Sequence, residues 1–160
     1  RKDHRGAVLE DLDAWRQTLD ASLTWLAAAG MDLTQVLVES LDYPLAWVAP
    51  LVEPRGMGWC LDIGHLLLYG LDLASHLARF GPTTRMLHLH GVAQGTHGPD
   101  GTGGQVRDHQ GLDAFPPDLG GRVRDTLVPF LRDYVHGLSL EVFSLEALNR
   151  SLTVFREWMA

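Results

Sequence analysis

The sequence predicts an α/β fold in which parallel strands alternate with helices. Three observations indicate this class. Short apolar, β-branched runs alternate with stretches of helical periodicity along the whole chain. These runs are apolar at successive positions, which is typical of buried parallel strands. No linker-like or repetitive tract divides the 160 residues beyond one Gly-rich stretch, so we expect a single domain over residues 1–160.

The first third of the chain predicts a helix, a strand and a second helix. The opening helix is indicated by apolar residues that recur every three or four positions before Gly30, namely Val8, Leu12, Trp15, Leu19, Leu23 and Leu26. The β-branched run over residues 34–40 predicts the first strand. Residues 43–56 predict a short helix that begins at Pro44 and is disturbed by Pro50.

The rest of the chain continues this alternation, with one long interruption. The predicted elements are a strand over residues 58–63, a helix over 71–81, a strand over 85–91, a helix over 117–135 and a strand over 138–143. Ser144 is expected to cap a final helix. Residues 92–115 predict a long Gly-rich loop, and a loop of that length inside a compact domain is usually functional or disordered. If functional, it would close over a substrate as a lid.

Composition excludes several classes of protein. The net charge is −7 and no Lys/Arg cluster is present, so no nucleic-acid partner is expected. No apolar run reaches the roughly 18 residues that a membrane helix needs, so no membrane partner is expected either. The single cysteine, Cys60, excludes an internal disulfide and suits a reducing compartment such as the cytoplasm.

A metal-competent side chain recurs at the end of each predicted strand. The strands read V-L-V-E, W-C-L-D, R-M-L-H and L-S-L-E, and they end at Glu39, Asp62, His88 and Glu141. Placed in register, equal positions of neighbouring parallel strands lie side by side, so these four residues are expected to converge. One acid at a strand end is usually a helix cap or a solvated loop residue, but four in register favour a site. Carboxylate and imidazole ligands suit zinc or manganese, and a cation offsets the repulsion between the acids.

Further candidate residues surround this position. His65 lies one turn beyond Asp62 and can reach the same space from the loop that leaves the strand. Asp108 and His109 offer two more ligands from the Gly-rich segment. His90 lies two residues after the histidine of the third strand, on the same face, and is expected to support a ligand rather than bind the metal itself.

Five stretches carry a resemblance to a known superfamily. They are "LVESLDYP", "CLDIGHLLLYG", "MLHLHGV", "DHQGL" and "LSLEVFSLEALNRSL". Together they resemble the xylose-isomerase-like TIM barrels, which include endonuclease IV and many sugar isomerases and epimerases. The resemblance covers strands five to eight, the C-terminal half of a (β/α)₈ barrel, with about four βα units. Within the superfamily, "LDIGHLL", "HLHGV" and "LEVF" are most similar to the cobamide-remodelling phosphodiesterases.

The resemblance implies roles for individual residues. It implies that Glu39 and Glu141 are catalytic and hold the metals at the centre, while the remaining ligands are Asp62, His65, His88 and His109. The endonuclease-like branch carries an aspartate two residues before the loop histidine, whereas here position 107 is Arg107 and Asp108 is adjacent. Arg107 is therefore expected to clamp a phosphate, and Asp108 to act as a secondary or substrate-contacting residue.

A complete barrel of this kind has about 250 residues and eight strand–helix units. This chain supplies about four units and lacks the first-half histidines of a multinuclear site. We therefore expect either a homodimer or a longer protein whose N-terminal half completes the barrel. A four-stranded half would otherwise expose two sheet edges.

Four functions compete. The leading hypothesis is a zinc- or manganese-dependent phosphodiesterase that hydrolyses the nucleotide-loop phosphodiester of a cobamide, a corrinoid small molecule. The second is a sugar phosphate isomerase or epimerase that uses one divalent metal with Glu39 and Glu141 as paired acid and base. The third is an endonuclease IV-like DNA repair enzyme, which the net charge of −7 disfavours. The fourth is an inactive half-barrel.

Overall fold

Four parallel strands form the central sheet in the computed structural model, which describes residues 2–93 and 107–160. The strands are β1 (Leu37–Glu39), β2 (Gly58–Asp62), β3 (Thr84–Leu89) and β6 (Gly137–Leu140). They lie in the order β1-β2-β3-β6, so each strand–helix unit is added beside the previous one. The predicted α/β fold with a parallel sheet is confirmed.

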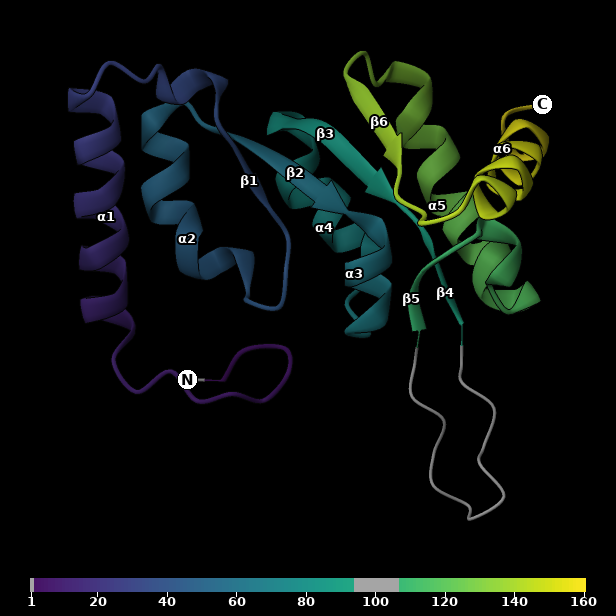
Figure 1. The fold of residues 1–160 in the computed structure, drawn as a ribbon, viewed down its shortest axis with the longest axis horizontal. Coiled ribbons are helices and arrows are strands. Elements are labelled where there is room, and N and C mark those ends of the chain that lie inside the picture. Colours follow the sequence, from purple (N-terminus) through teal and green to yellow (C-terminus); the bar gives the residue numbers. More distant parts are fainter. Residues whose placement is uncertain (1, 94–106) are drawn as a thin grey trace.

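The described helices connect the strands and flank the sheet. They are α1 (Leu12–Ala28), α2 (Leu45–Val52), α3 (Ile63–Leu68), α4 (Leu73–Phe80), α5 (Pro117–Asp133) and α6 (Leu145–Met159). Figure 1 shows α1 and α2 at the β1 end of the sheet and α5 and α6 at the β6 end. None of the described helices is both long enough and apolar enough to cross a membrane.

The core is built from alternate residues of the two central strands. The residues with no exposed surface on these strands include Trp59, Leu61, Leu87 and Leu89. Trp59 packs edge-on against Phe80 of α4, with ring centroids 5.2 Å apart. Burial of a large apolar side chain stabilises a fold by about 1.5–3 kcal/mol, so this layer holds the strand ends in fixed positions.

The ends of the helices follow from their caps. The Asp11 side chain accepts the backbone N–H of Ala14, so α1 begins at Leu12 and not at Val8, as the periodicity predicted. Val8 instead pairs with Lys2 in an isolated bridge and is 64% exposed. The predicted cap of the last helix is confirmed, because Ser144 accepts the backbone N–H of Ala147.

Helix α2 tolerates the internal Pro50 because its neighbour compensates for the missing donor. Proline cannot donate to the carbonyl four residues earlier, which is that of Ala46. Arg16 of α1 donates to this carbonyl at 3.2 Å and to the Trp47 carbonyl at 2.7 Å. The contact also joins α1 to α2. The disturbance predicted at Pro50 is therefore limited to the replacement of one backbone donor by the Arg16 side chain.

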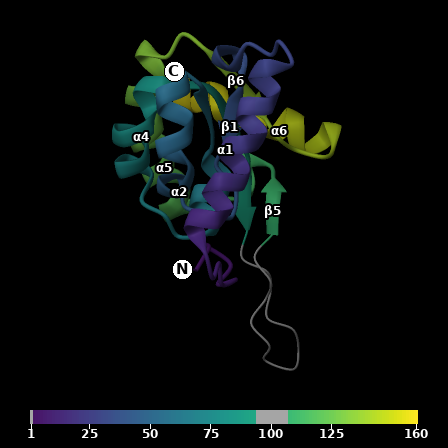
Figure 2. The same cartoon turned by 90° about the vertical axis from the view of Figure 1, so that its left-hand side faces the viewer.

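Two predictions about connections are wrong. Residues 92–115 are not a loop throughout, because β4 (Gly91–Ala93) pairs antiparallel with β5 (Arg107–Gln110), and a 3₁₀ turn (Leu112–Ala114) follows. Figure 2 shows this strand pair beyond the end of the main sheet. The segment after β2 is the helix α3 and not an exit loop. Residues 94–106, and with them most of the predicted lid, lie outside the described residues.

Candidate metal centre

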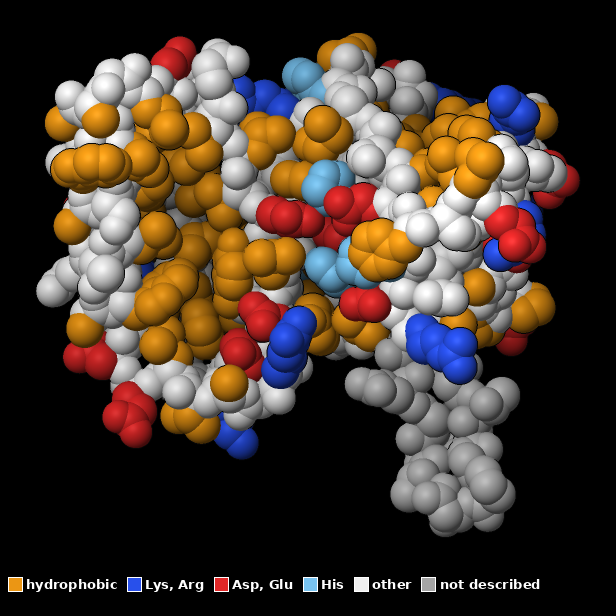
Figure 3. All heavy atoms as spheres, in the orientation of Figure 1, with side chains coloured by type: hydrophobic (Ala, Val, Ile, Leu, Met, Phe, Trp, Pro, Cys, Tyr) orange, Lys and Arg blue, Asp and Glu red, His pale blue; other side chains and the backbone are white. Residues whose placement is uncertain are grey.

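Four metal-competent residues gather at the carboxyl ends of the central strands. Glu39 ends β1, Asp62 ends β2, His88 lies in β3 and Glu141 directly follows β6. Each offers one donor atom, and these atoms all lie within 4.8 Å of one another. Figure 3 shows acidic and histidine side chains gathered at one place, beside hydrophobic side chains. We call these four residues the carboxylate cluster.

The strands meet in a register that differs from the predicted one. Asp62 pairs with His88 as expected, but Glu39 pairs with Cys60, two residues before Asp62. On the other side His88 pairs with Ser139, two residues before the glutamate that follows β6. Because side chains alternate with a period of two, an offset of two residues leaves each side chain on the same face. The convergence therefore survives the error in register.

One imidazole lies between the two glutamates of the carboxylate cluster. Nδ1 of His88 is 2.9 Å from Oε1 of Glu39 and 3.3 Å from Oε1 of Glu141. All three side chains keep some solvent exposure, so a ligand can reach them. Two carboxylates this close repel each other unless a positive charge lies with them. A protonated imidazole or a divalent cation meets that need.

Asp62 connects the carboxylate cluster to a second group of donors. It is fully buried, and its Oδ1 accepts the backbone N–H of His65 at 2.9 Å, which caps α3. Its Oδ2 lies 3.1 Å from Nδ1 of His65, and Oδ1 lies 3.1 Å from Nε2 of His90. With His109 these residues form the histidine cluster, whose donor atoms also lie within 4.8 Å of one another.

Buried atoms of the histidine cluster are left without hydrogen bonds. Oδ2 of Asp62, Nδ1 of His65 and Nε2 of His90 are buried and have no aligned hydrogen-bond partner among the described residues. Metal–ligand bonds of about 2.0–2.2 Å place neighbouring ligands roughly 3 Å apart, as the Asp62 and His65 atoms are. Unpaired buried polar atoms are costly, so this pair fits a divalent cation.

His109 links the two clusters through a strained backbone. It has a φ of 51° and is the one non-glycine residue with positive φ in the described chain. Such a conformation costs about 1–3 kcal/mol and is concentrated at functional sites. Its ring stacks on that of His90, with centroids 4.2 Å apart, and on that of Phe143 at 4.8 Å. Its Nε2 lies 3.6 Å from Oε2 of Glu141.

Burial and charge shift the pKa values of three groups at the centre. Burial disfavours the ionised form of Asp62, but its interactions with His90 and His65 outweigh burial and place its pKa below the ordinary value. Burial likewise disfavours charge on His90, and Asp62 outweighs it, so the pKa of His90 is raised. Burial, with the nearby carboxylates, raises the pKa of Cys60 to about 12.

These properties define which metals the residues fit. The donors of the two clusters are carboxylate oxygens and imidazole nitrogens, and the Cys60 thiol lies within 4.8 Å of the donor atoms of Glu39 and His88. Such a set suits zinc and manganese. The residues can form two donor groups that share Asp62, although metal binding itself stays a prediction.

The other predicted residues lie at the edge of the centre. Arg107 is exposed at the start of β5, and Oδ1 of Asp108 is 3.4 Å from Nδ1 of His109. The sequence interpretation missed Phe143, which covers the second face of the His109 ring. Its signal was available, since Phe143 lies on the same side as Glu141 if the extended chain continues past β6.

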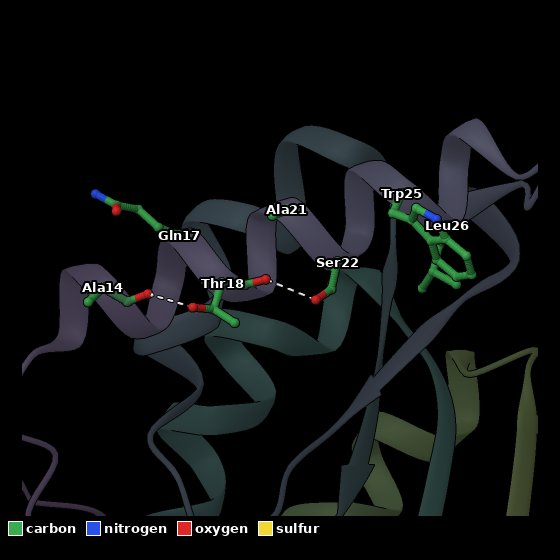
Figure 4. Close-up of a pocket in the computed structure, with 7 residues that line it drawn as sticks. All are labelled: Ala14, Gln17, Thr18, Ala21, Ser22, Trp25 and Leu26. Carbon is green, nitrogen blue, oxygen red and sulfur yellow. Dashed lines mark hydrogen bonds between the residues drawn. The ribbon is translucent and has the colours of Figure 1, made fainter.

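A hollow on the described surface lies away from this chemistry. Figure 4 shows it along α1, where residues such as Thr18, Ser22 and Trp25 line it. The hydroxyls of Thr18 and Ser22 donate to carbonyls one turn earlier in the same helix, at 3.0 and 2.9 Å. The lining of this hollow comes from one helix and offers no convergent polar groups. We therefore place the functional site at the strand ends.

Comparison with known proteins identifies the fold. No family model and no curated protein matches the chain. One similar solved structure is the probable 3-DHS dehydratase AsbF of Bacillus anthracis, which is involved in petrobactin synthesis. The match covers 91% of this chain and 56% of the dehydratase chain, with a TM-score of 0.58 and 15% sequence identity. Another is the 3-keto-D-glucoside 4-epimerase YcjR of E. coli. That match covers 96% of this chain and 57% of the epimerase chain, with a TM-score of 0.58 and 14% sequence identity.

Both neighbours are TIM-barrel-like enzymes, so the predicted fold of alternating strands and helices from such a barrel is confirmed. The chain spans little more than half the length of either neighbour. At these identities the likeness extends to the fold alone.

Proposed function

We propose that this chain carries the metal site of a divalent-metal-dependent phosphodiesterase. The observation that supports this is the presence of two donor groups, the carboxylate cluster and the histidine cluster, that share the buried Asp62. A shared carboxylate allows two cations to lie close together, and paired cations are typical of phosphoester hydrolysis. Zinc or manganese fits the donors. Cations held there would supply charge stabilisation to the phosphoryl and leaving oxygens.

Residues of the two clusters and of β5 have separate roles in this proposal. Glu39 and Glu141 are partly exposed, so they can hold cations and also face a substrate. His109 places Nε2 beside the Glu141 carboxylate, where it can hold a proton for the leaving oxygen. Arg107, exposed on β5, is suited to contact a phosphate as the substrate enters.

We propose the nucleotide-loop phosphodiester of a cobamide as the substrate. The stretches "CLDIGHLLLYG" and "LSLEVF" support this through their resemblance to cobamide-remodelling phosphodiesterases. The net charge of −7 weighs against a nucleic-acid phosphodiester, which would need a basic surface. The substrate is thus a small molecule with an internal phosphodiester.

The test is incubation of the protein with a cobamide and Mn²⁺ or Zn²⁺, followed by mass analysis of the corrinoid products. We expect cleavage of the nucleotide loop, and two metal ions per site by elemental analysis. The control is the Asp62→Asn protein, because the shared ligand is lost while the volume is kept. Unchanged cobamide with fully loaded metal would reject the substrate, and a single ion per site would reject the two-cation arrangement.

A sugar epimerase or isomerase is the second candidate. The fold shared with a sugar epimerase favours it, and so does the position of Glu39 and Glu141 on two sides of His88. Two such carboxylates can exchange protons with adjacent carbons while one metal holds the substrate oxygens. Deuterium incorporation from D₂O into a keto-sugar, with one ion per site, would support this function over phosphodiester cleavage.

A further inference from the structure

Phe143 is an exposed aromatic residue at the edge of the metal centre. Its side chain is 86% exposed, although it lies only two residues after Glu141 of the carboxylate cluster. Exposure of a large ring is costly in water, and beside a polar site it points to a binding role. Its ring stacks on that of His109, with centroids 4.8 Å apart and an interplanar angle of 16°.

The ring belongs to a stack that runs from the interior to the surface. His90 is fully buried, His109 lies on it with an interplanar angle of 11°, and Phe143 lies on His109. The inner ring is held because its Nδ1 accepts the backbone N–H of His109. The stack is therefore ordered from below, and it presents a flat apolar face to a ligand that approaches the clusters.

We propose that Phe143 binds a planar aromatic base that is covalently linked to the scissile phosphodiester. This inference rests on the proposed phosphodiesterase function and adds the chemical class of the group beside the phosphate. A base adds a fourth parallel ring to the stack, and base–aromatic stacking is favourable for any flat heterocycle. Sugar alone, without a base, lacks the aromatic face that this contact needs.

The test measures binding and not turnover. Isothermal titration of the Mn²⁺-loaded protein would compare two probes, a benzimidazole ribonucleoside 5′-phosphate and ribose 5-phosphate, which lacks the base. We expect the first probe to bind at least about tenfold more tightly. Phe143→Ala should bring the two dissociation constants to within about twofold of each other, while Phe143→Trp should keep the preference. Val135→Ala is the matched control, because Val135 is also 86% exposed but precedes β6 at its opposite end.

The outcomes separate this inference from the proposed function. Equal affinity of the wild-type protein for both probes would overturn it, and so would a preference that survives Phe143→Ala at unchanged metal content. A preference that depends on Phe143, in a protein that leaves cobamide intact, would support the stacking role and reject the cobamide substrate.

Discussion

The backbone N–H of His109 donates a hydrogen bond of 2.9 Å to Nδ1 of His90. The same Nδ1 lies 3.1 Å from the carbonyl oxygen of Gly91, so two backbone groups hold this side of the ring. On the other side of the ring, Nε2 is 3.1 Å from Oδ1 of Asp62. His90 is thus held between backbone groups and the Asp62 carboxylate, a position that suits a residue that supports the ligand Asp62.

Replacement of His90 by phenylalanine tests this support. The ring shape is kept, but Asp62 loses its neighbour and the His109 N–H loses its acceptor. Loss of such a supporting residue typically lowers metal affinity 10–100-fold, and we expect a fall of about this size for Mn²⁺. Titration calorimetry of the folded variant measures it, with His76→Phe, a half-buried histidine of α4 outside both clusters, as control. Unchanged Mn²⁺ affinity would show that Asp62 does not need His90 in order to bind the metal.

Gly64 of α3 gives a packing test of the same histidine. A Cβ added at this position would lie 2.1–2.3 Å from three atoms of the His90 ring. Gly64→Ala should therefore push the ring aside and lower the free energy of unfolding by about 1–3 kcal/mol. Gly121→Ala in α5 is the control, since its Cβ meets nothing within 4 Å and alanine should stabilise the helix by up to about 1 kcal/mol. Urea unfolding measures the stability of both variants. If Gly64→Ala were as stable as the wild-type protein, the close contact with the His90 ring would be contradicted.

Much of this centre is predictable because parallel strands place their carboxyl ends together. Glu39, Asp62, His88 and Glu141 stand out in the sequence since each interrupts an apolar run at the same point. Their common face follows from alternation alone. The register does not, because hydrogen bonds between strands can form at any offset of two residues without turning a side chain to the other face.

The details that sequence patterns miss here depend on contacts between distant segments. The pairing of β4 with β5 joins residues on two sides of a long insertion, and no local pattern in 107–110 indicates a strand. Helix α3 is only six residues long, so its apolar run resembles a continuation of β2. Its start was detectable, since Asp62 precedes His65 by three residues, the spacing of an N-cap.

The thiol of Cys60 should be unreactive in the native protein. Burial and the nearby carboxylates raise its pKa to about 12, so at pH 8 it is held as the neutral thiol below its pKa. Because the thiolate is the nucleophile, alkylation by iodoacetamide should be at least about 100-fold slower in the folded metal-free protein than in urea. Mass spectrometry over time measures the modification. Labelling at equal rates in both states would mean that the thiol is accessible and ionised.

Added metal should stabilise the fold. Asp62 is fully buried, and a cation that binds only the folded state adds RT ln(1 + [M]/Kd) to the free energy of unfolding. We expect about 2.7 kcal/mol at a Mn²⁺ concentration 100 times the dissociation constant. Urea unfolding with Mn²⁺ and with a chelator measures the difference. Asp62→Asn should abolish it, and an unchanged increase in that variant would locate the metal elsewhere.

Glu141 is the residue whose loss should most directly affect activity. Its Oε1 is 3.3 Å from Nδ1 of His88, and its Oε2 is 3.6 Å from Nε2 of His109, so it joins the two clusters. Glu141→Gln keeps the size but removes the charge that holds a cation, and we expect cobamide cleavage to fall by at least about 100-fold together with the metal content. Glu146→Gln is the matched control, because Glu146 is exposed on α6 and pairs with Arg150. Product mass analysis and elemental analysis of the same samples give both readouts. Wild-type cleavage by Glu141→Gln would remove this carboxylate from the mechanism, whereas full metal content with lost cleavage would assign it to proton transfer.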